Sequence, residues 1–147
     1  MPRSGMPPRN FMTCVPALLL LLAACGDNDP ATTPPPGGVL ATFAVAGEQF
    51  SVLVTHEPAI ADLLALWQGG GTATIPSGKV VRGAAPENAP WTWHLDGEDF
   101  AMAEVTIELC DGTPSYVEAH LDEWIEQVGR YCPWAAQLVA LEDRRFR

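Results

Sequence analysis

The chain has 147 residues, of which 48% are hydrophobic, and it carries 8 basic and 18 acidic side chains. The formal net charge of −10 argues against a nucleic-acid-binding function, because the phosphates of nucleic acid would repel so acidic a protein. This length allows one small domain beside any targeting segment.

Residues 1–24 have the pattern of an export signal. Two arginines and no acid precede an apolar run from Phe11 to Ala24, which is shorter than the about 20 residues that span a membrane. The run ends in Leu-Ala-Ala followed by Cys25, which resembles the bacterial lipobox. That resemblance implies cleavage before Cys25 and lipidation of this residue with palmitate-like chains, enough for stable anchoring. The alternative is an ordinary signal peptide with a chance cysteine.

The lipobox resemblance predicts an extracytoplasmic protein that contacts the membrane through its lipid anchor. Asp27 stands one place later than the position that favours retention in the inner membrane, so the outer membrane is the favoured location. Removal of residues 1–24 leaves six basic against eighteen acidic residues, a net charge of −12. Cationic partners and divalent cations therefore remain candidates.

Residues 25–38 form a predicted tether, and residues 39–147 a single globular domain. The tether contains four prolines and no large apolar side chain after Cys25, so it cannot bury enough surface to offset its ordering entropy. At about 3 Å per extended residue it would hold the domain some 40 Å from the membrane.

The first part of the domain reads as a hairpin followed by a helix. Two β-rich runs, 39–45 and 49–55, flank a turn at which Gly47 supplies a positive φ. Pro58 suits a first helical turn, and apolar residues then recur at helical spacing up to Trp67, which is expected to pack inward. The glycines at 69–71 end this helix.

The middle of the domain reads as strands. Residues 72–75 and 79–82 are either two short strands or one bent strand, and residues 91–95 form a further strand. Residues 96–99 read as a turn. Residues 101–109 alternate well, which predicts a half-buried strand with Ala101, Ala103, Val105, Ile107 and Leu109 facing inward.

The last part reads as a helix and a strand. Thr113 is the expected cap of a helix that begins at Pro114, presents Trp124 on its apolar stripe and ends at Gly129, and a final strand covers 138–141. The predicted class is α+β: a mostly antiparallel sheet of about five strands, with two helices packed on one face and one disulfide.

Two cysteines, Cys110 and Cys132, remain once the signal is removed and Cys25 is lipidated. In an exported protein they most simply form one disulfide, and a free catalytic thiol is the alternative.

The segments 75–83, 88–96, 108–112 and 132–134 resemble the BP-seventy-four N-terminal-domain family of small secreted or lipid-anchored, mostly bacterial domains. The resemblance covers nearly all of residues 40–141. It implies the domain limits and the pairing of the two remaining cysteines, and it implies no activity.

The densest group of metal-ligating residue types is His94, Asp96, Glu98 and Asp99, with Asp111 brought near by the following strand. Carboxylates in a turn are suitable Ca²⁺ ligands, although the spacing differs from the helix–loop–helix calcium loop. A zinc site needs three nitrogen or sulfur ligands and a water, and the cysteines are expected to be oxidised. The alternative is a solvated turn whose histidine caps a neighbouring backbone group, without a cofactor.

Three tryptophans occur in loop-like settings, Trp91, Trp93 and Trp134, and would stack on a glycan or contact a protein partner if they are exposed. Alternatively they cover the sheet edge and the disulfide. The main functional hypothesis is a non-enzymatic, lipid-anchored binding or interaction module. The other hypotheses are a small metal-dependent hydrolase that uses His94 and the adjacent carboxylates, and a protease-inhibitor-like domain whose inhibitory loop is 84–90. Nothing in the pattern predicts the oligomeric state.

Overall fold

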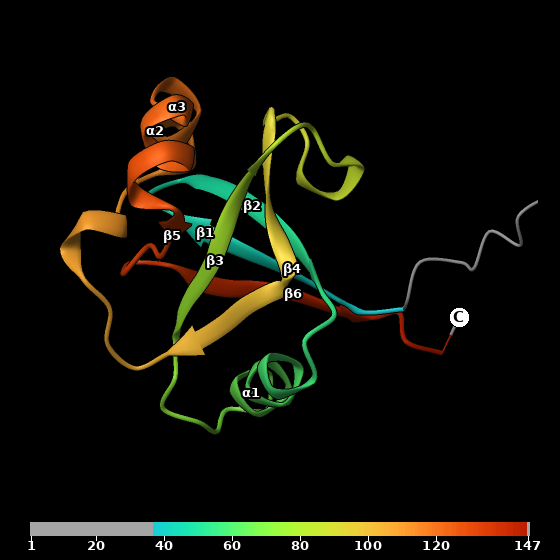
Figure 1. Cartoon of the computed structure of the whole chain (residues 1–147). Helices are drawn as coiled ribbons and strands as arrows, with labels where there is room; N and C mark the ends of the chain where they lie inside the picture. The colour runs from blue at the N-terminus through green and yellow to red at the C-terminus, as the bar shows by residue number, and fades with distance from the viewer. Residues whose placement is uncertain (1–36, 147) are drawn as a thin grey trace, which may run out of the picture. The chain divides into compact units, whose positions relative to one another are not determined.

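The computed structural model describes residues 37–146, so the predicted signal peptide and Cys25 lie outside the described residues. Figure 1 shows the arrangement of the elements. In chain order they are β1 (Val39–Val45), β2 (Glu48–Val54), α1 (Glu57–Trp67), β3 (Ile75–Arg82), η1 (Pro86–Asn88), β4 (Trp93–Ala103), η2 (Glu108–Cys110), α2 (Pro114–Ala119), α3 (Leu121–Glu123), η3 (Trp124–Val128), β5 (Arg130–Tyr131) and β6 (Gln137–Asp143).

The first antiparallel sheet has the strand order β2-β1-β6. The predicted hairpin is confirmed as β1 and β2, and its two-residue turn consists of Ala46 with φ 50° and Gly47 with φ 87°. Two successive residues with positive φ are the conformation that matches the twist of a tight hairpin. Alternate residues of both strands are buried, as the alternation of apolar residues predicts.

The second antiparallel sheet has the strand order β4-β3-β5. The alternative of one bent strand is confirmed for β3. The predicted turn at 96–99 is wrong, because β4 continues through these residues as a bulge. Val80 pairs with Leu95 and Gly78 with Phe100, so two steps along β3 correspond to five along β4, and β4 contains three extra residues.

This bulge changes which residues of β4 face the core. Side chains alternate along a strand, so an insertion of three residues exchanges the two faces. Phe100 and Met102 are buried as a result, whereas Ala101 is exposed. The prediction that Ala101 and the other odd-numbered residues of 101–109 face inward is therefore wrong. The predicted end of the strand is also wrong, because β4 ends at Ala103.

The two sheets come together at Gly97, inside the bulge. The backbone N–H groups of Thr55 and His56 both donate to the Gly97 carbonyl, at 3.1 and 3.2 Å. A Cβ atom on Gly97 would lie 2.0 Å from the carbonyl oxygen of Leu53, so only glycine allows this approach.

One aromatic core lies between the sheets. Phe50 stacks on Phe43 with ring centroids 5.3 Å apart and meets Tyr131 edge-on at 5.2 Å. Trp93 completes the group, since its ring lies 5.5 Å from Tyr131 and the residue is fully buried.

Helix α1 packs against β4 with Ile60 and Leu63, but the prediction that Trp67 packs inward is wrong. Burial decreases along this helix, from Ile60 at 1% exposed to Trp67 at 50%. The last turn of α1 thus extends beyond the surface that covers its first turns, and the Trp67 ring remains half-exposed.

The second predicted helix is confirmed in position and in its cap. The Thr113 hydroxyl accepts a hydrogen bond from the Tyr116 N–H, and the αL residue Gly129 ends the helical segment. The segment is interrupted at His120 and ends in a π-helical turn, so it comprises α2, α3 and η3.

The α+β class and the Cys110–Cys132 disulfide, with Cα atoms 5.1 Å apart, are both confirmed. The strands are divided between two three-stranded sheets, and Figure 1 shows α1 and the α2–α3 segment against different parts of them.

Candidate functional site

A hollow of about 400 Å³ lies beside His94 and contains part of the predicted ligand group. The carboxylate residues Glu87, Asp96 and Glu98 line it together with this histidine. The His94 Nδ1 atom lies 2.8 Å from the carbonyl oxygen of Gly83, which can only accept, so Nδ1 carries the hydrogen. The Nε2 atom is then the ring nitrogen left for a ligand, an orientation typical of histidines held for binding.

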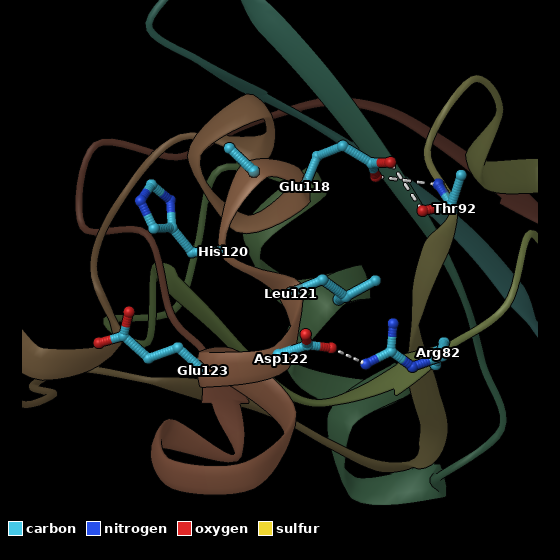
Figure 2. Close-up of a pocket in the computed structure, with 8 residues that line it drawn as sticks. Arg82, Thr92, Glu118, His120, Leu121, Asp122 and Glu123 are labelled. Atoms are coloured by element: carbon cyan, nitrogen blue, oxygen red, sulfur yellow. Dashed lines mark hydrogen bonds and ion pairs between the residues drawn. The ribbon is translucent and has the colours of Figure 1, made fainter.

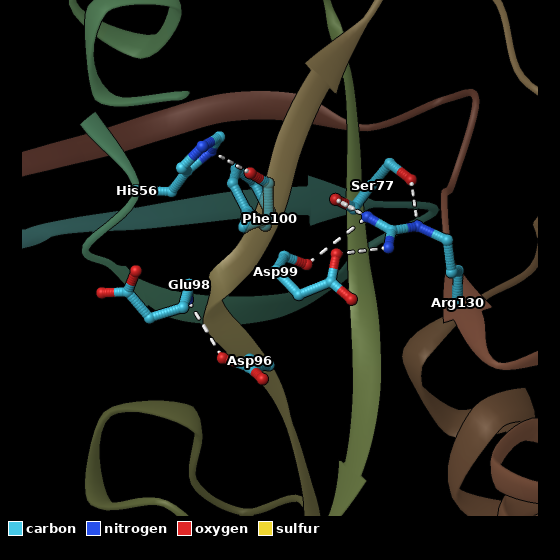
Figure 3. Close-up of polar contacts among 7 residues, drawn as sticks. All are labelled: His56, Ser77, Asp96, Glu98, Asp99, Phe100 and Arg130. Atoms are coloured by element: carbon cyan, nitrogen blue, oxygen red, sulfur yellow. Dashed lines mark hydrogen bonds and ion pairs between the residues drawn. The ribbon is translucent and has the colours of Figure 1, made fainter. Parts of the chain in front are cut away.

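The carboxylates of the β4 bulge have different partners, as Figure 3 shows. The Asp96 carboxylate accepts the backbone N–H of Glu98 at 3.0 Å, which stabilises the bulge itself. Asp99 belongs to another group: its carboxylate pairs with the Arg130 guanidinium at 2.6 Å, and the same guanidinium donates to the Ser77 carbonyl at 2.9 Å. Asp99 therefore connects β4 to β5 and is not in the His94 hollow.

Asp111 has a structural role beside the disulfide. Its carboxylate accepts the backbone N–H groups of Gly112 and Trp134, both at 2.9 Å. Burial, together with the nearby charges of Asp111 and Glu48, raises the pKa of Tyr131 far above its ordinary value. The Tyr131 hydroxyl thus stays protonated and donates to the Gly112 carbonyl at 3.0 Å.

The five predicted ligands are therefore not brought together. The hollow contains His94, Asp96 and Glu98, whereas Asp99 and Asp111 are held elsewhere. Within residues 37–146, no group of three or more His, Cys, Asp or Glu side chains has the arrangement that could hold a metal ion. The hollow is suited to hydrogen bonding and to attracting a cationic group.

A second hollow, of about 470 Å³, lies between β3 and the α2–α3 segment, and the sequence analysis did not find it (Figure 2). Its polar residues mainly hold the elements together. The Glu118 carboxylate accepts the Thr92 N–H at 3.0 Å and the Thr92 hydroxyl at 2.6 Å, and Arg82 forms an ion pair with Asp122. Its lining comes from segments far apart in the chain, so no sequence motif marks it.

The three loop tryptophans divide between the core and the surface. Trp93 is fully buried, and Trp91 stacks against it at 6.3 Å and donates its indole N–H to the Gln49 carbonyl at 2.8 Å. Both therefore belong to the scaffold. Trp134 is 48% exposed, and it is the one of the three whose ring remains largely accessible.

Three well-exposed aliphatic side chains follow directly after β4. Val105, Ile107 and Leu109 are 82%, 67% and 62% exposed, although the sequence pattern predicts that they face inward. The cause is the end of β4 at Ala103, after which the chain no longer follows the sheet. We call these three residues the aliphatic row.

The aliphatic row lies away from the end of the domain at which the described chain begins. The Arg144 N–H donates to the Gly38 carbonyl at 2.8 Å, so the two ends of the described chain meet. In Figure 1 the segment between β4 and α2, drawn in orange, lies on the opposite side from these ends. No helix within residues 37–146 is long and apolar enough to cross a membrane.

The comparisons with known proteins give one result. Neither the search of curated proteins nor the search of solved structures produced a match. The family model described as the BP-seventy-four N-terminal domain matches residues 39–145, more than half of the chain. The chain therefore belongs to the BP-seventy-four N-terminal-domain family.

Proposed function

We propose that the protein is a lipid-anchored, extracytoplasmic interaction module of the bacterial cell envelope, and that it binds a partner through the aliphatic row. The observation that carries this proposal is the exposure of three aliphatic side chains at alternate positions, Val105, Ile107 and Leu109, each more than 60% exposed. Exposed apolar patches on small domains mark interaction sites.

The chemistry of the surface favours a protein partner over a glycan. Glycan sites rely on accessible aromatic faces, and the aliphatic row contains none, while Trp134, the most exposed of the three loop tryptophans, is only half-exposed. Branched aliphatic side chains such as Val105 and Ile107 instead gain free energy by burial, about 25 cal/mol per Å² of apolar surface removed from water.

The position of the row is consistent with the predicted anchor. A tether at residues 25–38 would enter the domain beside Arg144, on the side opposite the aliphatic row. An anchored domain would then present the row away from its point of attachment.

Anchoring is tested by labelling cells with radioactive palmitate and fractionating their membranes. The native chain should be labelled and membrane-bound, and Cys25→Ser should lose both properties. Labelling and membrane association that persist in Cys25→Ser would refute the lipid anchor.

Binding is tested by placing a photo-reactive amino acid at position 107 of the full chain in intact cells. We expect a covalent adduct with a distinct protein, and we expect its loss when Val105 and Leu109 are both changed to Asn. The same probe at Ala61, an exposed position on α1, is the matched control and should give no such adduct. Equal labelling at both positions would contradict a binding surface at the row.

The alternative of a metal-dependent hydrolase rests on the orientation of His94 towards a hollow with carboxylates. Metal analysis of protein purified without chelator distinguishes it, since a stoichiometric metal that is lost in His94→Ala would favour the hydrolase. Calcium at the acidic bulge stays a prediction, and the same measurement tests it with Asp96→Asn.

The inhibitor alternative rests on the loop at 84–90. Asn88 fixes this loop, because its buried side chain accepts the Ser51 N–H and donates to the Trp93 carbonyl, both at 2.8 Å. A panel of proteases incubated with the native chain tests it, and unchanged protease activity would exclude it.

A further inference from the structure

We propose that Glu104–Ile107 binds an extended segment of another protein as an added β-strand, and that this bound segment alternates Lys or Arg with apolar residues. The proposal rests on the proposed function and names the chemical class of its partner. Three properties of the segment support it: its unpaired backbone, its side-chain pattern and its charge.

The backbone of the segment has the unpaired groups of an edge strand. The ladder between β3 and β4 ends at the pair Ile75–Ala103. Beyond it, the backbone N–H groups of Val105, Thr106 and Ile107 donate no hydrogen bond to any other residue in the described part of the chain. Ile107 is extended, with φ −90° and ψ 148°. The N–H groups of Val105 and Ile107, which point to the same edge of an extended chain, are unpaired donors of the kind that a further strand uses, whereas the Ile107 carbonyl already accepts the Cys110 N–H.

The side chains have the pattern that a strand requires. Val105 and Ile107 alternate with Glu104 and Thr106 up to the start of η2 at Glu108, and the β-branched Val105, Thr106 and Ile107 favour the extended conformation. In an added strand, apolar residues of the partner would pack on Val105 and Ile107 of the aliphatic row, while its basic residues would lie near Glu104 and Glu108. The segment thus has strand chemistry, although no strand of the described domain pairs with it.

The charge around the segment selects a basic partner. Between Glu98 and Gly129 the sequence contains nine acidic residues and no Lys or Arg. Two of these acids have arginine partners in the described structure, Asp99 and Asp122, whereas no ion pair is found there for Glu104 or Glu108. An incoming strand with Lys or Arg would therefore meet an acidic surface that has little cationic compensation.

The same charge argues against three other occupants. A second copy of this chain would place Glu104 and Glu108 opposite like charges. The predicted tether carries Asp27 and Asp29 and no basic residue, so it has no complementary charge. An anionic membrane surface would repel this part of the domain.

The test starts with a displayed library of random twelve-residue peptides, selected on the purified full chain. We expect enrichment of sequences that alternate Lys or Arg with Val, Ile or aromatic residues. The best peptide is then synthesised and titrated against the native chain and its variants. No enrichment, or enrichment of sequences without basic residues, would overturn the proposal.

The backbone contact is tested at Ile107. The Ile107→Pro variant keeps an apolar side chain but removes the N–H donor, and we expect at least a tenfold loss of affinity from the broken strand geometry. The Ile107→Val variant keeps the donor and should bind within about twofold of the native chain. Thermal unfolding of both variants shows whether they are folded. Hydrogen exchange in the native chain gives a second readout, because bound peptide should protect the N–H groups of Val105 and Ile107, which share one edge, more than that of Thr106. Absence of that protection would contradict strand addition.

The charge contact is tested with two matched variants. Glu108→Gln should weaken binding about two- to fivefold, as expected for a surface ion pair. Glu57→Gln removes one exposed charge near Gly97 and Arg145, at the end where the described chain begins, and should leave affinity unchanged. Equal effects would refute a specific contact at Glu108.

Two further measurements separate the other outcomes. Binding to phosphatidylglycerol vesicles and not to peptides would replace the proposed partner with a membrane. Dimerisation that depends on Ile107, measured by sedimentation, would replace it with a second copy of the chain. A protein adduct at position 107 in cells, without any strand-forming peptide ligand, would leave the interaction module standing and refute strand addition. Failure of both experiments would refute both proposals.

Discussion

The close approach at Gly97 allows a sharp prediction about the stability of the domain. A Cβ atom at this position would lie 2.0 Å from the Leu53 carbonyl oxygen, well inside van der Waals contact. In Gly97→Ala the bulge must therefore move away from β2, and the hydrogen bonds that Thr55 and His56 donate to the Gly97 carbonyl lengthen or break.

The magnitude follows from these two effects. Loss of two backbone hydrogen bonds costs about 0.5–1.5 kcal/mol each. Forced displacement of packed backbone costs about 1–3 kcal/mol. Gly97→Ala should thus lower the free energy of unfolding by about 2–6 kcal/mol, a large part of the roughly 5–15 kcal/mol that holds a typical domain together.

Urea denaturation of the full chain, followed by tryptophan fluorescence, measures this effect. Gly70→Ala is the matched control, because its new Cβ would meet only the Ala65 carbonyl, at an ordinary distance of 3.5 Å. The Gly70→Ala control should raise the free energy of unfolding slightly, by less than about 1 kcal/mol. If Gly97→Ala lowers the free energy of unfolding by less than about 1 kcal/mol, the packing of the two sheets does not depend on the close contact between Gly97 and Leu53.

Three further predictions concern the disulfide, a helix cap and the response to acid. Replacing Cys110 and Cys132 together by Ala should cost about 3 kcal/mol in denaturant unfolding, because the bond closes a loop across 22 residues; an unchanged midpoint would contradict this. Thr113→Ala should cost about 1 kcal/mol and Thr113→Ser much less, since only the hydroxyl caps the Tyr116 N–H. The Arg145 guanidinium lowers the pKa of Asp143 from 3.8 to about 2, so its stabilising contribution is present above pH 4 and is lost as the pH falls to 2. The thermal unfolding temperature should therefore fall less steeply between pH 5 and pH 2 in Asp143→Asn than in the native chain. Identical pH profiles would show that the Asp143–Arg145 pair does not contribute to stability.

Local patterns in the sequence were sufficient for the elements that depend on near neighbours. The β1–β2 hairpin, the Thr113 cap and the end of the second helical segment at Gly129 all form where turn and capping residues predict them. Each depends on contacts within a few residues, and these contacts are the same in any tertiary context.

The candidate site was only partly predictable. His94 and Asp96 line one hollow, as their closeness in the sequence predicts. The partners of Asp99 and Asp111, however, come from β5 and from the segment after the disulfide. Arg130 is the residue that removes Asp99 from the ligand group, and no spacing rule connects the two.

The sequence by itself determined the class of the domain, its family, its acidic surface and the pairing of its cysteines. Only the tertiary structure decided the register of β4, because the three-residue bulge at 96–99 arises where Gly97 approaches β2. That bulge exchanges the faces of the strand. The alternation of 101–109 is a property of the chain alone, whereas burial depends on where the opposing strand ends, and β3 pairs no further than Ala103. The residues that look most like a core strand are for this reason the most exposed apolar residues of β4 and the segment that follows it, and they form the surface to which we assign binding.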